Sequence, residues 1–327
     1  MSPPEGRPLD LVVVGDCNPD VLVLGDDVTP EFGQQEKLVP SMSLVVGGSA
    51  SITAVAAARL GLSVALVAAV GADPAGQFML GQMAAEGVVT GAVAVREDVP
   101  TGMTVALSNG ADRAILTALG AVGSLTAADV PAGLLARARH VHLSSYFLVE
   151  DSLGPGLAGL LSTARAGGAT TSLDTNWDPS GRWGDERLAA AIAQTDLLLP
   201  NEAEALRLSG AGSLDDAVST LATVGRRLVV KLGERGVVCA DRSTRHEVSV
   251  PAVTPVDTTG AGDCFNAGLI AGLLQGLALP TAAALGCATG ALSTGGLGGT
   301  ASAPDLPTAA RLAALASESS RRSAGSD

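Results

Sequence analysis

Val256-Asp257-Thr258-Thr259-Gly260-Ala261-Gly262-Asp263-Cys264-Phe265 follows an extended run at 246–253 and opens an apolar segment of helical length. Its two glycines let the backbone approach a ligand closely. The N–H groups of 260–263, which have no partner at a helix start, form an anion hole. The carboxylate of Asp263 could cap the helix or interact with its dipole. Alternatively, it removes a proton from a hydroxyl while the N–H groups stabilise a transferring phosphoryl group. The stretch alone leaves both interpretations open.

On either side of this stretch, short β-branched runs alternate with Ala- and Leu-rich segments, which is typical of a parallel sheet covered by helices on both faces. The predicted strands are Leu9–Val14, Ser63–Val70, His140–Ser144, Thr170–Asp174, Leu197–Leu199, Leu228–Leu232 and Gly236–Ala240. The predicted helices lie at 50–60, 75–86, 154–166, 186–194, 202–209 and 214–224. We therefore expect an α/β fold with a doubly wound, mainly parallel sheet flanked by helices.

Two regions, 20–46 and 92–118, contain extended, turn-punctuated segments without an intervening helix. The second has Ser-Asn-Gly at 108–110 between two alternating apolar runs, which is a hairpin signal. These regions predict a small β-sheet lid that projects from a core domain. The core would comprise 1–16, 45–91 and 120–327, and the lid 17–44 and 92–119.

The chain has 327 residues and a formal charge of −13, from 20 Lys and Arg against 33 Asp and Glu. This balance and the small number of aromatic residues exclude a nucleic-acid-binding surface, which needs clustered cations and stacking rings. Four cysteines lie far apart and the N-terminus has no signal-peptide pattern. We therefore expect reduced core cysteines and a cytoplasmic location.

Residues 264–304 contain no charged side chain, as in a membrane span. However, a span needs about 20 continuous apolar residues, and polar residues, Pro280 and several glycines interrupt this run. We expect two buried helices, at 261–277 and 281–294, and no membrane partner. The polar ends, 1–7 and 315–327, are expected to fray.

The 256–265 stretch closely resembles the second signature of the ribokinase/PfkB family of carbohydrate kinases, and the resemblance extends from about Leu9 to Ala303. It implies an ATP-dependent kinase with Asp263 as the catalytic base. Gly260, Ala261 and Gly262 would supply the anion hole. The family further implies Mg²⁺ as a cofactor and a small sugar as the substrate.

Two segments resemble the sugar-binding motifs of the family. In the turn Gly15–Asp20, Asn18 and Asp20 would bind sugar hydroxyls, although a strand-ending turn of Asn, Pro and Asp explains the same residues. In Leu44–Ser51, the pair Gly47 and Gly48 would bring the backbone to the substrate. Ile52 stands where the family often has a substrate-contacting Asn, which puts a ribokinase-like set of sugar contacts in doubt.

Two further segments resemble the nucleotide-binding motifs. In Pro200–Glu204, Asn201 and Glu204 would organise Mg²⁺ and the phosphates, largely through water. A helix-capping arrangement explains the same pair. In Lys231-Leu232-Gly233-Glu234-Arg235-Gly236, Lys231 would neutralise phosphate, and Gly233 and Gly236 would let the nucleotide approach.

The segment 291–302 occupies the place where the family wraps the adenine and, in many members, a monovalent cation such as K⁺. Asp257 and Thr259 would share that cation site. Lid sheets of the family often form dimer interfaces, so a homodimer through the lid is expected. Arg113 could reach the substrate, but a solvated position at the lid tip is favoured.

Substrate charge is predicted from Asp174-Thr175-Asn176-Trp177-Asp178, which resembles the Asp-x-Asn-x-Arg of fructokinase-like members. Asp178 stands in place of the Arg that an acidic sugar would need, so we predict a neutral sugar. A nucleoside kinase is a second hypothesis, which the scarcity of stacking rings disfavours. A non-catalytic sugar or nucleotide sensor is a third. His142 and Tyr146 are predicted to line the cleft wall without acting in catalysis.

Overall fold

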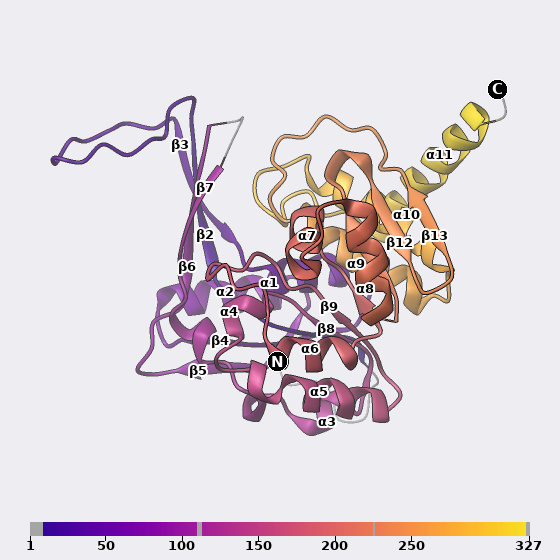
Figure 1. Ribbon diagram of the computed structural model, residues 1–327. Coiled ribbons are helices and arrows are strands. Elements are labelled where there is room, and N and C mark those ends of the chain that lie inside the picture. The colour runs from indigo at the N-terminus through magenta and orange to yellow at the C-terminus, as the bar shows by residue number, and fades with distance from the viewer. Residues whose placement is uncertain (1–8, 110–112, 225, 325–327) are drawn as a thin grey trace.

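The computed structural model describes residues 9–109, 113–224 and 226–324 (Figure 1). Within these ranges, nine strands form one large sheet whose central strands are parallel. Its spatial order is β13 (Arg245–Val248), β12 (Val237–Ala240), β11 (Leu228–Lys231), β10 (Leu197–Leu198), β9 (Thr170–Leu173), β8 (Ala138–Leu143), β1 (Leu9–Val14), β4 (Val64–Gly71) and β5 (Val89–Arg96). Only β12 and β13 run antiparallel to their neighbours. The predicted mainly parallel α/β fold is confirmed.

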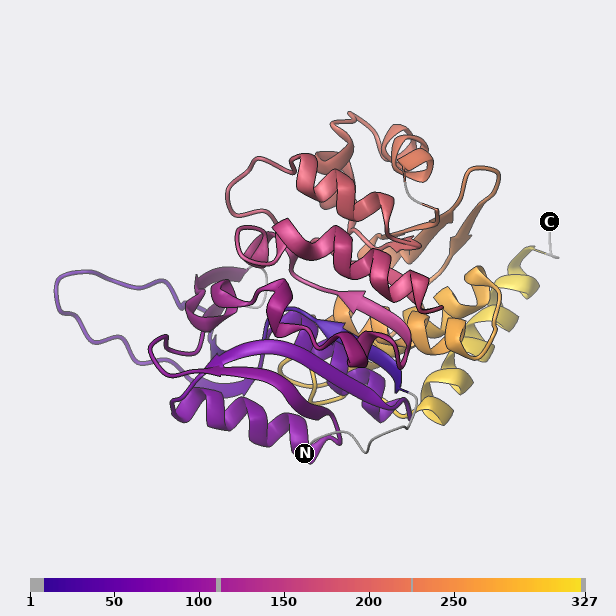
Figure 2. The ribbon, with the colours of Figure 1, turned by 90° about the horizontal axis from the view of Figure 1, so that it is seen from below.

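Helices cover both faces of this sheet because successive residues of its strands point to opposite sides. In β1, Val12 and Val14 belong to one hydrophobic core, and Leu11 and Val13 belong to another. The first face carries α3 (Ala132–Leu135), α4 (Tyr146–Val149), α5 (Gly154–Ala166), α6 (Glu186–Ala193), α7 (Glu202–Ser209) and α8 (Leu214–Val224). The second carries α1 (Ser49–Arg59), α2 (Pro74–Ala85), α9 (Ala261–Leu274), α10 (Leu279–Ser293) and α11 (Leu306–Ala324). Figure 2 shows strands between these two helical layers.

The chargeless stretch forms two buried helices, α9 and α10, as predicted. They pack closely because small residues face each other: a Cβ on Gly268 would lie 2.4 Å from Thr289 Oγ1, and one on Gly286 would lie 2.8 Å from the ring of Phe265. Among the described residues, no helix is both long and apolar enough to cross a membrane.

A second sheet contains four strands in the order β3 (Ser41–Val46), β2 (Pro19–Leu24), β6 (Met103–Ser108) and β7 (Arg113–Ala118). It projects from the body of the molecule (Figure 1). The predicted β6–β7 pair is antiparallel, as in a hairpin. The Gly110 of its Ser-Asn-Gly signal lies outside the described residues. Short 3₁₀ turns at Gly120–Ser124, Ala127–Asp129 and Gly233–Arg235 complete the elements in these ranges.

The predicted bounds of the lid are wrong at two places. Residues 92–96, predicted in the lid, lie in β5, which pairs with β4 at the edge of the large sheet because its partly buried apolar residues pack there. Residues 45–46, predicted in the core, lie in β3 and pair with β2 in the small sheet. The segment 315–324 was expected to fray, but it continues α11, which packs against α10 through its earlier apolar residues, including the buried Ala309. Residues 1–7 and 325–327 lie outside the described ranges.

Candidate active site

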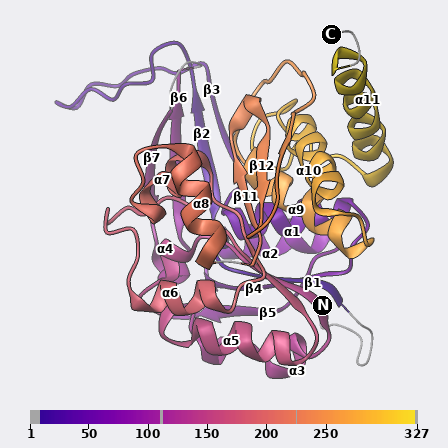
Figure 3. The same ribbon diagram turned by 45° about the vertical axis from the view of Figure 1, so that its right-hand side comes forward.

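The predicted site residues come together where several strands of the large sheet end. Asp16 follows β1, Asp174 follows β9, Lys231 ends β11, and the first turn of α9 carries Asp263. In open α/β sheets, ligands bind outside these carboxyl ends. Figure 3 shows the small sheet and the β11–β12 region at the same edge of the molecule.

The start of α9 has the geometry of an anion hole. Gly260 precedes the helix with φ 71°, a left-handed conformation that favours glycine. A Cβ there would lie 2.6 Å from the Gly299 Cα, and no side chain caps the helix. Ala261 N donates to Thr258 O over 3.3 Å, so the N–H groups of Gly260, Gly262 and Asp263 are the ones in this turn that can reach a ligand.

Asp263 lies in this first turn and is 8% exposed. Burial raises its pKa well above the ordinary value, and the nearby Asp174 carboxylate raises it further, while Lys231 opposes both effects. A carboxylate with raised proton affinity is suited to accept a proton from a hydroxyl. The capping interpretation of Asp263 is wrong, because Gly260 occupies the cap position and no side chain bonds there.

The four residues predicted for sugar binding are in mutual contact. Asn18 Nδ2 donates to Asp20 Oδ1 over 3.3 Å, and a Cβ on Gly47 would lie 1.9 Å from that same oxygen. Gly48 has φ 77° and lies against Asn18 Oδ1. Burial, followed by the charge of Asp16, raises the pKa of Asp20 to about 7. The Asp20 carboxylate therefore lies directly against Gly47, and the Asn18 amide lies against Gly48, at the start of α1.

Two neighbouring residues serve the structure of this region. Asp16 accepts hydrogen bonds from the backbone N–H groups of Ser49 and Ala50, at 3.0 and 2.9 Å, and so stabilises the start of α1. Ile52 packs against Gly260 and Gly299. A Cβ added to these glycines would lie 3.0 and 2.5 Å from the Ile52 side chain. The Ile52 side chain thus packs against the loop that ends at Gly260, directly before the anion hole.

A cavity of about 770 Å³ lies between the first turn of α9 and the end of β11. Lys231, Gly233, Gly236 and Gly262 line it together with apolar residues, among them Val250, Val253, Phe265 and Ala291. A Cβ on Gly236, where φ is 89°, would lie 2.0 Å from Val248 O. An apolar cavity that reaches an anion-binding helix start is suited to a nucleotide.

Asn201 and Glu204 form a capping box at the start of α7. Asn201 Oδ1 accepts from Glu204 N over 2.9 Å, and the Glu204 carboxylate accepts from the N and Nδ2 of Asn201, at 2.9 and 2.7 Å. The capping interpretation therefore holds. Glu204 is only 4% exposed, and burial, followed by the charge of Asp174, raises its pKa to about 7. A buried carboxylate with this proton affinity suits a nearby cation.

The pair Asp257 and Thr259 is held within its own loop. Asp257 Oδ1 accepts from Thr259 N and Oγ1, at 2.9 and 2.7 Å, and Oδ2 accepts from Gly298 N over 2.8 Å. Arg113 of β7 donates to Thr258 Oγ1 and Thr259 Oγ1, each over 2.9 Å, and lies 3.8 Å from Asp257 Oδ1. The favoured position of Arg113 as a solvated tip is therefore wrong. The side chain joins the small sheet to the loop before the anion hole, a long-range contact that no local motif indicates.

Two residues predicted to line the cleft wall are instead in the core. His142 and Tyr146 are fully buried. His142 lies 2.7 Å from Ser172 Oγ and 2.9 Å from Ser144 Oγ, so it belongs to a polar row between β8 and β9. Sequence reasoning also gave no role to Asn266 of α9, which donates to Asp174 Oδ2 over 2.6 Å.

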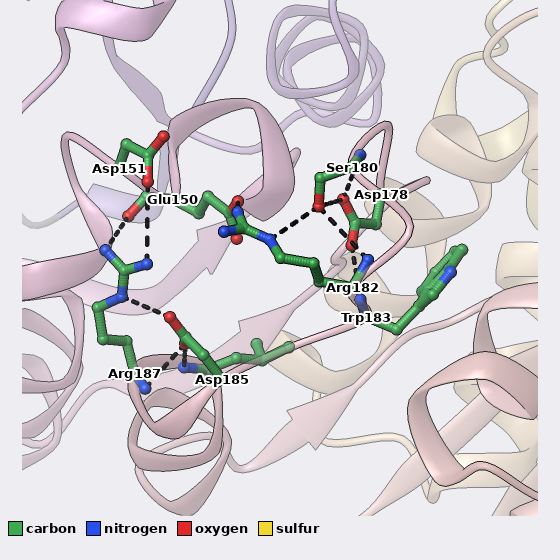
Figure 4. Close-up of polar contacts among 9 residues, drawn as sticks. Glu150, Asp151, Asp178, Ser180, Arg182, Trp183, Asp185 and Arg187 are labelled. Carbon is green, nitrogen blue, oxygen red and sulfur yellow. Dashed lines mark hydrogen bonds and ion pairs between the residues drawn. The ribbon is translucent and has the colours of Figure 1, made fainter.

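Asp178 is buried and engaged within its own loop. Its carboxylate accepts from Ser180 N and Oγ, both at 2.7 Å, and from Trp183 N over 2.6 Å, which stabilises the 178–183 loop. Figure 4 shows Arg182 between Ser180 and Glu150. Arg182 is thus already paired with an acid and does not take the place of the missing arginine.

A buried carboxylate lies beside an N–H-lined turn, with an apolar cavity on one side and the polar cluster of Asn18 and Asp20 on the other. This arrangement is compatible with a small-molecule kinase. The chain belongs to the pfkB family of carbohydrate kinases: the model of the "pfkB family carbohydrate kinase" matches residues 9–306. It is therefore an ATP-dependent kinase of the sugar or nucleoside type, as the motifs predicted.

Relatives and solved structures resemble the chain over most of its length. The fructokinase of Klebsiella pneumoniae is 31% identical over 271 residues, which cover 78% of this chain and 85% of that protein. The ribokinase of Haemophilus influenzae is 27% identical over 306 residues, covering 90% and 95%. A putative Ribokinase II from E. coli in complex with ATP and Mg²⁺ has a similar fold, with a TM-score of 0.82, 23% identity and coverage of 94% and 99%.

Proposed function

We propose that the protein transfers the γ-phosphoryl group of ATP to a hydroxyl of a small neutral sugar, with Asp263 as the base. The observation that carries this proposal is the position of Asp263, buried in the first turn of α9 behind the positive-φ Gly260. The carboxylate and the N–H groups of this turn lie at one place, so the site can accept a proton and stabilise a transferring phosphoryl group together.

In the proposed reaction, Asp263 takes the proton of the sugar hydroxyl while the oxygen bonds to the γ-phosphorus. The bond from that phosphorus to the β–γ bridging oxygen breaks, and ADP leaves with its electron pair. The N–H groups of 260–262 stabilise the charge on the transferring group. Asn18, Asp20 and the Gly47–Gly48 backbone hold the sugar.

Mg²⁺, when bound, would neutralise charge on the phosphates. The Glu204 carboxylate already accepts two hydrogen bonds from Asn201 in the capping box. Asn201 and Glu204 would therefore hold this ion through its water molecules and not by direct ligation. No three His, Cys, Asp or Glu among the described residues are grouped closely enough to hold a metal ion. Phosphate oxygens and water would therefore have to complete its shell. We propose no K⁺, because Arg113 already places a positive charge 3.8 Å from Asp257.

The preference for a neutral sugar rests on the charges of the site. Asp16, Asp20 and Asp263 are buried carboxylates at the sugar side. The nearby Arg113 guanidinium is engaged by Thr258 and Thr259. Burial already raises the pKa values of these three acids, so a further carboxylate on the substrate, desolvated beside them, would be unfavourable.

A nucleoside is the second candidate substrate, because Trp177 is 55% exposed and lies next to Asn176. Asn176 Nδ2 donates to Ser49 Oγ over 2.9 Å, which places this segment beside the glycine pair. An exposed indole can stack on a base. The third hypothesis, a non-catalytic sensor, is disfavoured by the intact carboxylate and anion hole.

The test is ADP release by the purified protein and its Asp263→Asn variant over neutral sugars, sugar acids, sugar phosphates and nucleosides. We expect turnover with a neutral sugar, and a loss of about 10²- to 10⁴-fold in the variant with sugar binding retained. Near wild-type turnover by Asp263→Asn would refute the mechanism. A sugar acid ranked above every neutral sugar would refute the substrate class.

A further inference from the structure

The buried carboxylate of Asp174 joins three elements at the centre of the site. It follows β9 and is 1% exposed. Its Oδ2 accepts from Lys231 Nζ at the end of β11 and from Asn266 Nδ2 of α9, the latter over 2.6 Å. Its Oδ1 accepts from Asn176 N over 3.3 Å. One side chain thus ties the strand beside the nucleotide cavity to the helix that carries Asp263.

The contact with α9 is made one helical turn from Asp263. Residues three apart in a helix lie on the same face, so Asn266 and Asp263 are neighbours on that face. Lys231 Nζ lies 3.6 Å from the position of a Cβ on Gly262, which places the ammonium group beside the first turn of α9. Asp174, Lys231 and Asn266 therefore hold the first turn of α9 in place.

The charges that face Asp263 come from three strand ends. They are the carboxylates of Asp16, after β1, and Asp174, after β9, and the ammonium group of Lys231 on β11. Ser49 of α1 supplies a hydroxyl hydrogen bond. Asp16 is already engaged by the start of α1, so the Asp174–Lys231 ion pair is the adjustable part of this field.

We propose that Asp174, Lys231 and Asn266 form a charge-compensated unit that positions Asp263 and sets the field in which it accepts the proton. Lys231 thus acts on the base through its ion pair with Asp174, not by neutralising phosphate. This inference rests on the proposed function of Asp263. The Asp174 carboxylate raises the pKa of Asp263 and the Lys231 ammonium lowers it, so the two charges act in opposite directions.

The experiment is the pH profile of kcat/KM for the sugar at saturating MgATP, whose acid limb reports the proton affinity of the base. Lys231→Met leaves the Asp174 charge uncompensated, so the acid limb moves up by roughly 1 to 3 pH units. Asp174→Asn leaves the Lys231 charge uncompensated, so the limb moves down. The double variant restores neutrality, and its limb returns to within about half a pH unit of the wild-type position.

Opposite shifts distinguish this role from a structural one, because loss of packing alone lowers activity without moving the limb in opposite directions. Arg245→Met is the control, since this residue pairs with Asp215 and Glu247 on the surface and its loss should leave the limb unchanged. Circular dichroism and thermal unfolding identify variants that fold. A single variant can fail to fold, because an unpaired buried charge is costly. The double variant leaves neither charge of the Asp174–Lys231 pair without the other, and a limb displaced by more than 1 pH unit in it would then overturn the proposal.

The two proposals fail differently. If the Asp263→Asn enzyme were active, Asp263 would not be the base, and this inference would lose the function on which it rests. An inactive Asp263→Asn enzyme, together with single variants whose acid limbs stay in place or move in the same direction, would overturn the inference and leave the proposed function standing.

Discussion

Replacing one buried histidine of the large sheet should make protein stability less sensitive to acid. His140 lies 2.7 Å from Thr170 Oγ1 and 2.7 Å from Ser172 Oγ, and His142 connects Ser172 Oγ to Ser144 Oγ. Burial lowers the pKa of His140 to about 3 and that of His142 to about 4. Both rings are therefore neutral in the folded protein at ordinary pH.

The magnitude follows from the difference between the folded and unfolded states. An unfolded histidine has a pKa of 6.5. As pH falls below this value, His142 becomes protonated in the unfolded state but stays neutral in the folded state until about pH 4. The stability that is present above pH 6.5 is therefore progressively lost. At pH 5 the gap is about 1.5 pH units, which at 1.36 kcal/mol per unit costs about 2 kcal/mol for His142.

The pH dependence of the wild-type protein alone does not isolate this effect. The pKa values of Asp20 and Glu204 are raised to about 7. As pH falls from about 7, these two carboxyl groups become protonated in the folded state before they do so in the unfolded state. They therefore stabilise the folded state until the pH reaches their lower pKa values in the unfolded chain. Their contribution opposes that of the histidines over the same window. A comparison between wild type and a His142 variant removes it.

The assay is urea unfolding followed by tryptophan fluorescence at pH 8 and pH 5. His142→Gln keeps a neutral hydrogen-bonding side chain, so its free energy of unfolding relative to wild type should rise by about 2 kcal/mol between pH 8 and pH 5. His246→Gln, on the exposed β13, is the control and should show no such change. The reasoning is refuted if the His142→Gln difference is the same at both pH values.

Two further predictions concern the small sheet. Arg113→Met removes two hydrogen bonds from a charged donor to the loop before the anion hole. We expect kcat/KM to fall by about 10- to 100-fold. Arg139→Met on β8 is the control and should leave kcat/KM unchanged. Equal kcat/KM values for the two variants would contradict the role of Arg113. Apolar residues Leu44 and Leu116 are exposed on the sheet face opposite Asp20. We propose that this face pairs with a second copy, so Leu116→Lys should halve the mass measured by light scattering, and a monomeric wild-type protein would contradict this.

The sequence was most informative where function depends on a short run of backbone. Gly260 needs a positive φ, and Gly47 leaves the space into which the Asp20 carboxylate fits. Such requirements are local, so the residue type alone indicates them. The mainly parallel α/β class of the core was likewise predicted, from the alternation of strand and helix patterns along the chain.

Contacts between distant segments could not be predicted in this way. Arg113 and Thr259 are 146 residues apart, and Asn266 and Asp174 are 92 apart. Their pairing depends on how the two sheets and α9 are arranged, which no local pattern encodes. The boundary of the lid failed similarly, because the alternating apolar residues of β5 fit the edge of either sheet and only pairing with β4 decides between them.

The scarcity of aromatic residues shows how composition can mislead about a substrate. The chain has two Trp, one Tyr and four Phe, which argued against a nucleoside on number alone. Yet Tyr146, Phe147, Trp183 and Trp177 form one chain of edge-to-face contacts, with centroids 5.3, 5.6 and 4.8 Å apart in turn. The half-buried Trp183, itself packed on the buried Phe147, supports the exposed Trp177 and limits the orientations open to its indole. One well-supported ring suffices to stack one base, so the position of these residues bears on the substrate more than their number does.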